Sequence, residues 1–214
     1  MERIQLKALG KINLGIDVLG KRENGYHDVR MIMQTVYLYD EVTLEKRQEP
    51  GITVSTNLIY LPTDKTNIAY RAAKILLDEF GERRGVAIHL KKHIPVAAGM
   101  AGGSADAAAV LFGMNRMFGW KLSEKELMER GVTLGADVPY CIMRGTALAE
   151  GIGEKLTRLP AMPKCHLLIA KPPISVSTKL VYEKLDALAI VDHPDIDGII
   201  EGLKDRDLIR VAGS

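Results

Sequence analysis

Apolar and polar residues alternate with a period of two through much of the first half of the chain. Such alternation, or a short apolar run, is typical of β-strands whose two faces differ in burial. The pattern predicts strands at residues 3–6, 12–19, 31–46, 52–55 and 86–90, and further strands at 141–149 and 166–170. The dipeptide Asn24-Gly25 favours a turn between two of these strands, because both residues tolerate positive φ.

A different period, with apolar residues three and four positions apart, marks the helices. It predicts helices at residues 67–80, 104–118, 123–130, 177–185 and 195–203. Ser123 and Glu126 have the spacing of a capping box, which supports the start of the third helix. Because several strands come before the first helix, the order of elements favours an α+β fold over alternating βαβ units.

The length of the chain allows one large domain or two modest ones. Its 214 residues are 47% apolar and 26% charged, which is ordinary for a globular protein and argues against intrinsic disorder. Pro160 and Pro163 lie in a change of composition at residues 157–164. We therefore predict a domain boundary in this stretch, with one domain at 1–158 and the other at 159–214.

Charge and hydropathy argue against several classes of protein. The formal net charge of +2 does not support general nucleic-acid binding, which concentrates cations against phosphates. Nearly apolar stretches such as 107–114 are far shorter than the roughly 18 residues that suggest a membrane span. The N-terminus lacks the apolar core of a signal peptide. We expect a cytoplasmic protein with no nucleic-acid partner and no membrane partner.

The chain has two cysteines, Cys141 and Cys165, without the paired spacing of a zinc site. Free cysteine is among the most buried residue types, so we expect both thiols to lie reduced in a core. Four histidines also lack ligand spacing, and we expect them to be structural or exposed: His89, His93, His166 and His193.

The most informative segment is residues 95–106, Pro-Val-Ala-Ala-Gly-Met-Ala-Gly-Gly-Ser-Ala-Asp. Its small side chains let backbone N–H groups approach a ligand closely. The helix predicted after it offers unpaired N–H donors at its N-terminus, which suits a nucleotide phosphate. The segment is neither a Walker A motif nor a dinucleotide fingerprint. Composition alone leaves phosphate binding and tight helix packing equally open.

Two short motifs carry side chains that suit catalysis. In Gly10-Lys-Ile-Asn-Leu-Gly15, Lys11 and Asn13 alternate along a predicted strand and therefore share one face. In Leu134-Gly-Ala-Asp-Val-Pro139, Asp137 lies in a turn of small residues ahead of a predicted strand. Taken singly, a lysine is more often solvated and an aspartate more often caps a turn.

Together and in this order, the motifs resemble the superfamily of galactokinase, homoserine kinase, mevalonate kinase and phosphomevalonate kinase. The resemblance is carried by Lys11-Ile-Asn-Leu, Asn24-Gly-Tyr-His, residues 95–109 and Leu134-Gly-Ala-Asp-Val-Pro. Gly-Tyr-His with Ala-Gly-Gly-Ser-Ala-Asp is similar to the branch that uses ATP to phosphorylate a cytidine diphosphate alcohol. One departure is Leu9-Gly10, where the family commonly has Pro-Ala.

The resemblance implies a two-domain small-molecule kinase of the α+β class. Residues 1–158 would form an N-terminal domain similar to a ribosomal-protein S5-like fold, which binds ATP and carries catalysis. Residues 159–214 would be the first part of an incomplete C-terminal substrate domain. The family's chains continue for several dozen residues, with a third glycine-rich motif at the phosphate site. We therefore expect this chain to lack the C-terminal part and to be nearly inactive as it stands.

The resemblance also implies roles for single residues, with ATP and Mg²⁺ as cofactors. Asp137 is implied as the general base for the substrate's 2-hydroxyl, and Lys11 would hold that carboxylate ionised. Asn67 is implied to contact adenine, and Ser104 is the candidate ligand of Mg²⁺. The ATP phosphates would lie against the backbone of Pro95, Val96, Ala97, Ala98, Gly99, Met100, Ala101, Gly102, Gly103 and Ser104.

Recognition of the cytidine diphosphate substrate is implied for four further residues. Asn13, Tyr26 and His27 would contact it, since an aromatic ring stacks on a base and a neutral histidine offers a donor and an acceptor. Tyr182 would close the other face of the base. Taken alone, Tyr26 would be a turn-packing tyrosine and His27 a solvated histidine.

Two alternatives stay open on the sequence. The first is another kinase of the superfamily that acts on a different small alcohol. The second is a non-catalytic nucleotide-binding or RNA-associated module. The near-neutral charge speaks against RNA, and the pairing of Lys11 with Asp137 speaks for chemistry. The sequence indicates no oligomeric state.

Overall fold

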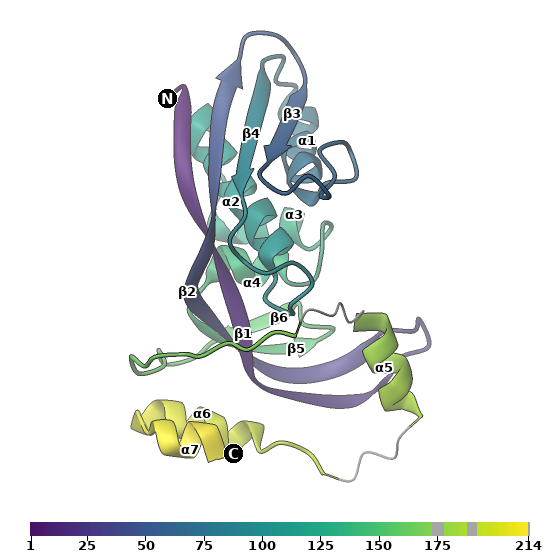
Figure 1. Cartoon of the computed structure of the whole chain (residues 1–214), viewed down its shortest axis with the longest axis vertical. Coiled ribbons are helices and arrows are strands. Elements are labelled where there is room, and N and C mark those ends of the chain that lie inside the picture. The colour runs from purple at the N-terminus through teal and green to yellow at the C-terminus, as the bar shows by residue number, and fades with distance from the viewer. Residues whose placement is uncertain (173–177, 188–191, 214) are drawn as a thin grey trace. The chain divides into compact units, whose positions relative to one another are not determined.

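A computed structural model describes residues 1–172, 178–187 and 192–213 of the chain (Figure 1). The strands are β1 (Arg3–Lys21), β2 (His27–Arg47), β3 (Ile52–Thr56), β4 (Gly85–Lys91), β5 (Thr146–Gly151) and β6 (Lys155–Arg158). The helices are α1 (Ile68–Phe80), α2 (Gly102–Phe118), α3 (Glu124–Gly131), α4 (Val138–Met143), α5 (Thr178–Asp186), α6 (Ile196–Asp205) and α7 (Leu208–Gly213). The expected α+β class is confirmed.

The strands form one mixed sheet in the order β3-β4-β2-β5-β6, and β1 pairs with β2 beside this path. β2 is long enough to take two antiparallel partners in succession, β5 along residues 29–34 and β4 along residues 41–47. β3 and β4 run parallel. The connection between them contains α1, because parallel neighbours need a crossover rather than a tight turn.

The chain folds as two compact units that interleave in sequence. The first unit comprises Met1–Lys11, Val36–Pro95 and Ala101–Met143, and the second comprises Ile12–Thr35, Val96–Met100 and Arg144–Ser214. The domain boundary expected after residue 158 stays a prediction. None of the helices in the described residues is long and apolar enough to cross a bilayer.

The core of the first unit lies between its strands and the helices α1 and α2 (Figure 1). Val42, Leu44, Val86 and Ile88 alternate along β2 and β4 and are fully buried. α2 approaches the sheet closely at Gly113, where a Cβ atom would lie 2.6 Å from the Cδ1 of Leu44. A glycine at this position therefore sets the distance between helix and sheet.

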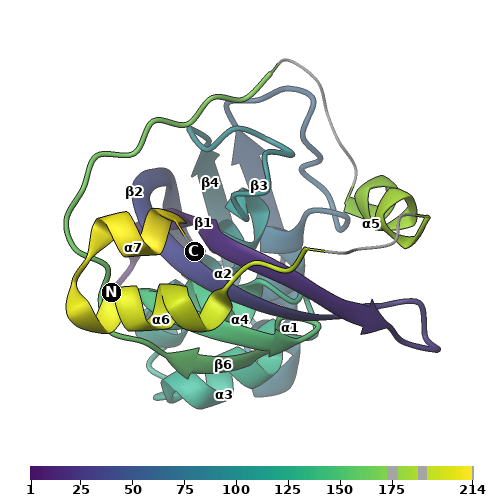
Figure 2. The ribbon, with the colours of Figure 1, turned by 90° about the horizontal axis from the view of Figure 1, so that it is seen from below.

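In the second unit, α6 and α7 pack against the strands (Figure 2). The buried cluster consists of Ile32, Ile196, Ile199, Leu203 and Val211. Gly15 of β1 allows α6 to come close, since a Cβ atom there would lie 2.7 Å from the Cδ1 of Ile199. α6 begins after Asp195, whose side chain accepts a hydrogen bond from the N–H of Gly198 at 2.8 Å.

Strongly periodic segments agree with the sequence analysis. The strands expected at 31–46, 52–55 and 86–90 and the helices expected at 67–80, 104–118 and 195–203 are confirmed. The capping box of Ser123 and Glu126 is present. The helix expected at 177–185 is confirmed as α5, although Ser177 lies outside the described residues.

The strand expected at 141–149 is wrong in its first part, because Val138–Met143 form α4 and β5 begins only at Thr146. Pro139 lies in the first turn of α4, where its missing N–H would have no intrahelical acceptor. The N–H of Cys141 donates to the carbonyl of Asp137 at 3.0 Å, which is the first helical hydrogen bond. Cys141 is buried as expected, whereas Cys165 is exposed, and both are free thiols.

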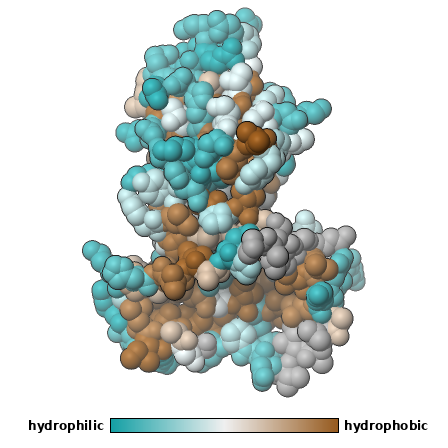
Figure 3. Space-filling model, in the orientation of Figure 1, coloured by the Kyte–Doolittle hydropathy of each residue, from teal (hydrophilic) through white to brown (hydrophobic). Residues whose placement is uncertain are grey.

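The strand expected at 166–170 is also wrong, since this segment has no regular structure. Its run of Leu167, Leu168 and Ile169 is exposed, Leu168 by 98%. Apolar side chains gather on the visible face of the second unit (Figure 3). A strand needs a neighbour to take up its backbone N–H and C=O groups, and alternation in the sequence does not reveal that neighbour.

Three further differences between the predicted and the observed elements concern the length of an element. β1 runs unbroken from Arg3 to Lys21, so Gly10 is an ordinary strand residue and not a break between two strands. The pattern does not predict β6 or α7. These elements have 4 and 6 residues, which is too short for either period to stand out.

Candidate active site

The glycine-rich loop before α2 has an unusual backbone. Ala97, Gly99 and Ala101 take positive φ angles of 54°, 70° and 56°. A left-handed conformation costs a non-glycine residue on the order of 1–3 kcal/mol and persists only where the surroundings enforce it. Turns of this kind direct backbone N–H groups into a concavity that suits an anion. These φ angles are therefore compatible with an anion-binding turn in the loop.

The start of α2 leaves its donors available. Ala101 occupies the N-cap position and makes no side-chain hydrogen bond to the helix. The N–H groups in the first turn of a helix have no intrahelical acceptor. Because the cap lacks a side chain that could accept from them, these groups and the positive end of the helix dipole suit a bound phosphate.

Two neighbouring glycines in this turn differ in how closely they are packed. A Cβ atom on Gly102 would lie 3.1 Å from the Cγ2 of Ile94, which is a tight contact. A Cβ atom on Gly103 would meet nothing closer than the Cγ2 of Ile68 at 3.6 Å, and Gly103 is exposed. Tight packing therefore accounts for a glycine at 102 but not for one at 103.

A buried ion network that the sequence analysis did not find lies in the first unit. Lys92 donates hydrogen bonds to Asp40 and, at 2.5 Å, to Oδ2 of Asp106. The other oxygen of Asp106, Oδ1, is buried and has no hydrogen-bond partner in the described structure. Burial raises the pKa of Asp106 to about 7, Lys92 opposes this shift, and the neighbouring Asp40 adds to it.

The proposed catalytic pair lies in the first unit. Lys11 is on β1 and only 5% exposed, and Asp137 is half-buried in the turn directly before α4. Asn13 follows Lys11 by two positions on β1, which gives both side chains the same face of the strand, and it is half-buried. Asn13 belongs to the second unit.

Asn67 has a structural role in the described structure. It is the N-cap of α1, and its Oδ1 accepts a hydrogen bond from the N–H of Ala69 at 2.8 Å. Its Nδ2 donates to the carbonyl of Pro62 at 2.7 Å. The amide therefore holds the start of α1, and its implied contact with adenine stays a prediction.

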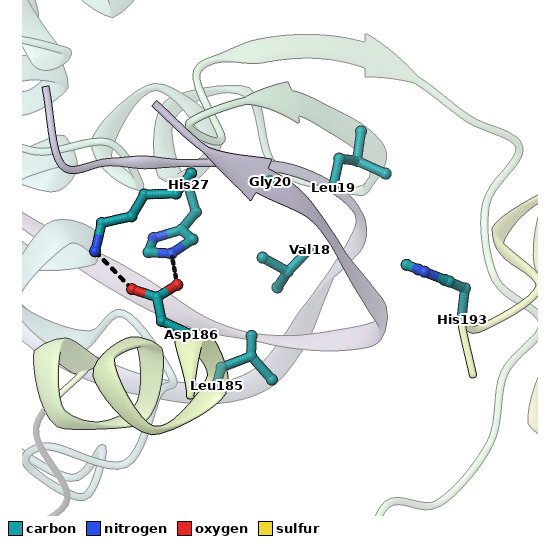
Figure 4. Close-up of a pocket in the computed structure, with 8 residues that line it drawn as sticks. Val18, Leu19, Gly20, His27, Leu185, Asp186 and His193 are labelled. Atoms are coloured by element: carbon teal, nitrogen blue, oxygen red, sulfur yellow. Dashed lines mark hydrogen bonds and ion pairs between the residues drawn. The ribbon is translucent and has the colours of Figure 1, made fainter. Parts of the chain in front are cut away.

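A pocket of about 300 Å³ lies in the second unit, beside His27 (Figure 4). It is lined by Val18, Leu19, Gly20, Lys21, His27, Leu185, Asp186 and His193. Asp186 accepts hydrogen bonds from Lys21 and from Nε2 of His27, each at 2.6 Å. The two hydrogen bonds lower the pKa of Asp186, Lys21 more than His27. An ionised carboxylate only accepts, so His27 carries its proton on Nε2.

The aromatic partner of His27 is Tyr182. The two rings are stacked, with their centroids 4.5 Å apart and an angle of 15° between their planes. Tyr26 is 59% exposed and does not line the pocket, and its N–H donates to Oδ1 of Asn24 at 3.1 Å. The structure thus brings together His27 and Tyr182, which the sequence analysis named, and adds Asp186, which it did not name.

In the parts of the chain that the structure describes, no three histidine, cysteine, aspartate or glutamate side chains gather as a metal cluster. Magnesium in nucleotide sites usually keeps several waters and takes one or two protein ligands together with phosphate oxygens. The hydroxyl of Ser104, half-buried in the first turn of α2, fits such a site. The donor set therefore suits a magnesium ion that arrives with ATP.

Comparison with known proteins gives relatives in one group of kinases. A family model described as the GHMP kinases N terminal domain matches residues 67–145. The 4-diphosphocytidyl-2-C-methyl-D-erythritol kinase of Lachnospira eligens is 60% identical over 212 residues, which is 99% of this chain and 74% of that protein. The protein of the same name from Lachnoclostridium phytofermentans is 58% identical over 99% of this chain and 73% of its own length.

The solved structures agree. A crystal structure of 4-(cytidine 5'-diphospho)-2C-methyl-D-erythritol kinase superposes with a TM-score of 0.76 and is 31% identical in sequence. The match covers 94% of this chain and 72% of that one. Both the sequence and the fold are thus similar to those of the same group of enzymes.

Proposed function

The chain belongs to the 4-diphosphocytidyl-2-C-methyl-D-erythritol kinase family of the GHMP kinases, and from that premise we propose its reaction and the residues that perform it. It transfers the γ-phosphoryl group of ATP to the 2-hydroxyl of 4-diphosphocytidyl-2-C-methyl-D-erythritol, a step of the non-mevalonate route to isoprenoid precursors. The observation that carries this proposal is the 60% identity to a kinase of that name over 99% of the chain.

ATP binds to the first turn of α2 and to the loop before it. Backbone N–H groups of Ala101–Ser104 donate to the phosphates, and the exposed Gly103 lets them come close. Ser104 provides a hydroxyl ligand for Mg²⁺. When bound, the metal ion neutralises negative charge on the phosphates. Asn67, at the start of α1, lies near the adenine.

Phosphoryl transfer requires in-line positioning and an acceptor for the proton of the attacking hydroxyl. Asp137 accepts that proton. The turn between Gly135 and Pro139 holds its carboxylate in place. Lys11 keeps the carboxylate of Asp137 ionised and stabilises the charge on the transferring group. The burial of Lys11 limits the water that would screen its charge.

The cytidine group of the substrate binds at the pocket beside His27. The stack of His27 and Tyr182 supplies the aromatic surface for cytosine, and Asp186 fixes which nitrogen of His27 carries the proton. With Nε2 protonated, Nδ1 of the neutral ring accepts a hydrogen bond from the base. Asn13 and Tyr26 complete the contacts with the substrate.

The proposal extends to the organisation of the whole protein. Residues 1–158 form the ATP-binding and catalytic domain, with a ribosomal-protein S5-like fold. Residues 159–214 begin a C-terminal substrate domain. The enzyme works in the cytoplasm, where its two substrates are available.

A coupled assay for ADP release tests the function. The 214-residue chain and a version extended to the length of the relatives are each given MgATP and 4-diphosphocytidyl-2-C-methyl-D-erythritol. We expect ADP release from the longer protein with this substrate, and much less with mevalonate or homoserine. Equal turnover of the three alcohols would contradict the proposed specificity, and no turnover of any would contradict the kinase activity.

A further inference from the structure

The network of Asp40, Lys92 and Asp106 joins both ends of the glycine-rich loop. Asp40 lies on β2, Lys92 directly follows β4, and Asp106 lies in α2 just beyond its first turn. The loop therefore begins after Lys92 and ends before Asp106. Oδ1 of Asp40 also accepts hydrogen bonds from the backbone N–H groups of His93 at 2.5 Å and Ile94 at 2.8 Å. The chain is thus fixed on both sides of the loop.

The strained backbone of the loop needs its two ends to be held in place. Ala97 and Ala101 stay in left-handed conformations only because the surrounding structure enforces them. Gly102 lies directly against the network, since a Cβ atom on it would be 3.5 Å from Oδ2 of Asp40. A displacement of the network would therefore reach the first turn of α2.

We propose that Lys92 and Asp106 are positioning residues for ATP. Together with Asp40, they clamp the two ends of the loop and hold the N–H groups of the first turn of α2 in the arrangement that binds phosphate. The inference rests on the proposed kinase function. It assigns a role to two buried side chains that need not touch ATP themselves.

The test compares two substitutions at one position. Asp106→Ala removes the tie between Lys92 and α2, whereas Asp106→Asn keeps an acceptor for Lys92. The matched control is Glu79→Gln, which removes an ion pair between Glu79 of α1 and Arg130 of α3 in the same unit. Calorimetry with MgATP gives the dissociation constant, and steady-state kinetics give KM for each substrate.

We expect Asp106→Ala to weaken ATP binding about tenfold, within the range usual for coupling through neighbouring residues. KM for the cytidine substrate and kcat at saturating ATP should change little. Asp106→Asn should bind ATP much as the wild type does, because its amide oxygen still accepts a hydrogen bond from Lys92. Glu79→Gln should follow the wild type in both measurements.

Three results would overturn the inference: unchanged ATP affinity in Asp106→Ala, equal changes in KM for both substrates, or the same loss of ATP affinity in Asp106→Asn as in Asp106→Ala. If Asp106→Ala fails to fold, Lys92→Gln breaks the same tie from its other end, and an unchanged ATP affinity in that variant would overturn the inference. Calorimetry with ATP needs no turnover, so failure of the cytidine substrate to react would contradict the proposed function and leave this inference to be judged by ATP binding alone.

Discussion

Each unit of the molecule contains a small ion network that joins distant parts of the chain, and the two networks differ in burial and in whether the lysine or the aspartate is the shared member. In the first unit, the ammonium of Lys92 lies between two carboxylates, and all three side chains are at most 4% exposed. In the second unit, the carboxylate of Asp186 lies between Lys21 and His27, and the Lys21 side chain is 55% exposed.

The pKa values of the two aspartates shift in opposite directions as a result. Burial raises the pKa of Asp106, and its partner Lys92 does not compensate because Lys92 is shared with Asp40. Hydrogen bonds from Lys21 and His27 lower the pKa of Asp186, since water still reaches this pair and little desolvation opposes them. The same types of side chain are thus accompanied by pKa shifts of opposite direction in the two aspartates. The degree of burial decides the direction of the shift.

The difference matches the tasks proposed for the two units. A loop that must hold a phosphate chain in one geometry benefits from a rigid, buried support. A pocket that must open for a base needs contacts that water and ligand can replace, and the exposed network beside His27 provides them. The predictions below test this division, from the largest expected effect to the smallest.

The largest effect is expected at Asp137 of the first unit. Asp137→Asn keeps the size of the side chain but removes the proton acceptor, so kcat should fall by about 10²–10⁴-fold. The affinity for ATP should change little, because we propose that the carboxylate acts on the hydroxyl of the substrate and not on ATP. Steady-state kinetics in the full-length protein with saturating MgATP measure both. If more than about a tenth of kcat remains, a change below about 1.4 kcal/mol, the general-base role is wrong.

Lys11→Met provides the matching test of cooperation between the two residues. We expect it to lower kcat as well. The double substitution should lose less than the sum of the two single losses in free energy, because the residues act as a unit. Strict additivity would indicate that Lys11 acts independently of Asp137.

In the second unit, Tyr182→Ala should raise KM for the cytidine substrate and leave KM for ATP unchanged. Loss of a base–aromatic stack is worth on the order of 1–3 kcal/mol, or about tenfold to a hundredfold. Tyr26→Ala should have a smaller effect on the same KM, because Tyr26 is 59% exposed whereas Tyr182 stacks on His27. An effect of Tyr26→Ala alone would move the aromatic contact to Tyr26, and equal effects on both KM values would indicate a structural role for Tyr182.

Two adjacent glycines separate ligand binding from packing in the first unit. Gly103→Val should weaken ATP binding by about tenfold or more and leave the fold largely intact, because its Cβ atom would have only an ordinary contact with Ile68 at 3.6 Å and the added bulk would lie where we propose that the phosphates bind. Gly102→Val should instead lower the free energy of unfolding, since its side chain would press against Ile94. Calorimetry with MgATP and thermal unfolding distinguish the two. A normal ATP affinity in Gly103→Val would sink the phosphate-loop assignment.

The sequence predicts the parts of the fold that local periodicity controls. The apolar stripe of α1 and the capping box of α3 depend on residues within a few positions of one another, and both are confirmed. α4 escapes prediction because six residues make too short a stripe. The segment at 166–170 has the alternation of a strand but no neighbouring strand, and no local pattern contains that information.

The residues of the candidate site likewise divide into those in local motifs and those that only the fold brings together. The loop and Asp137 lie in contiguous motifs, so the sequence alone is enough to propose them as site residues. The buried network is not found, because Asp40 and Lys92 are 52 positions apart and each is an ordinary charged residue by itself. Asp186 is missed for the same reason, at 159 positions from His27. Supporting residues of a site are assembled by the fold, and sequence motifs mostly identify the residues that they support.

The smallest effect, on stability, tests the electrostatic comparison itself. The pKa of Asp106 is raised from 3.8 to about 7, so its favourable contribution to folding is present below about pH 4 and lost as the pH rises through about 7. The pKa of Asp186 is lowered from 3.8, so its contribution is present above about pH 4 and lost as the pH falls below that value. The two carboxylates therefore make stability depend on pH with opposite signs.

Urea unfolding of Asp106→Asn and Asp186→Asn from pH 3 to 8 measures both dependences. Relative to the wild type, Asp106→Asn should gain stability steadily from about pH 4 to 7, because it no longer has an acid to ionise in the core. Asp186→Asn should lose a little stability above about pH 4 and match the wild type below it. Salt should shrink only the second difference, since exposed charges are screened and buried ones are not. If both variants change in the same direction with pH, burial is not what separates the two networks, and the rigid support assigned to the ATP loop loses its electrostatic basis.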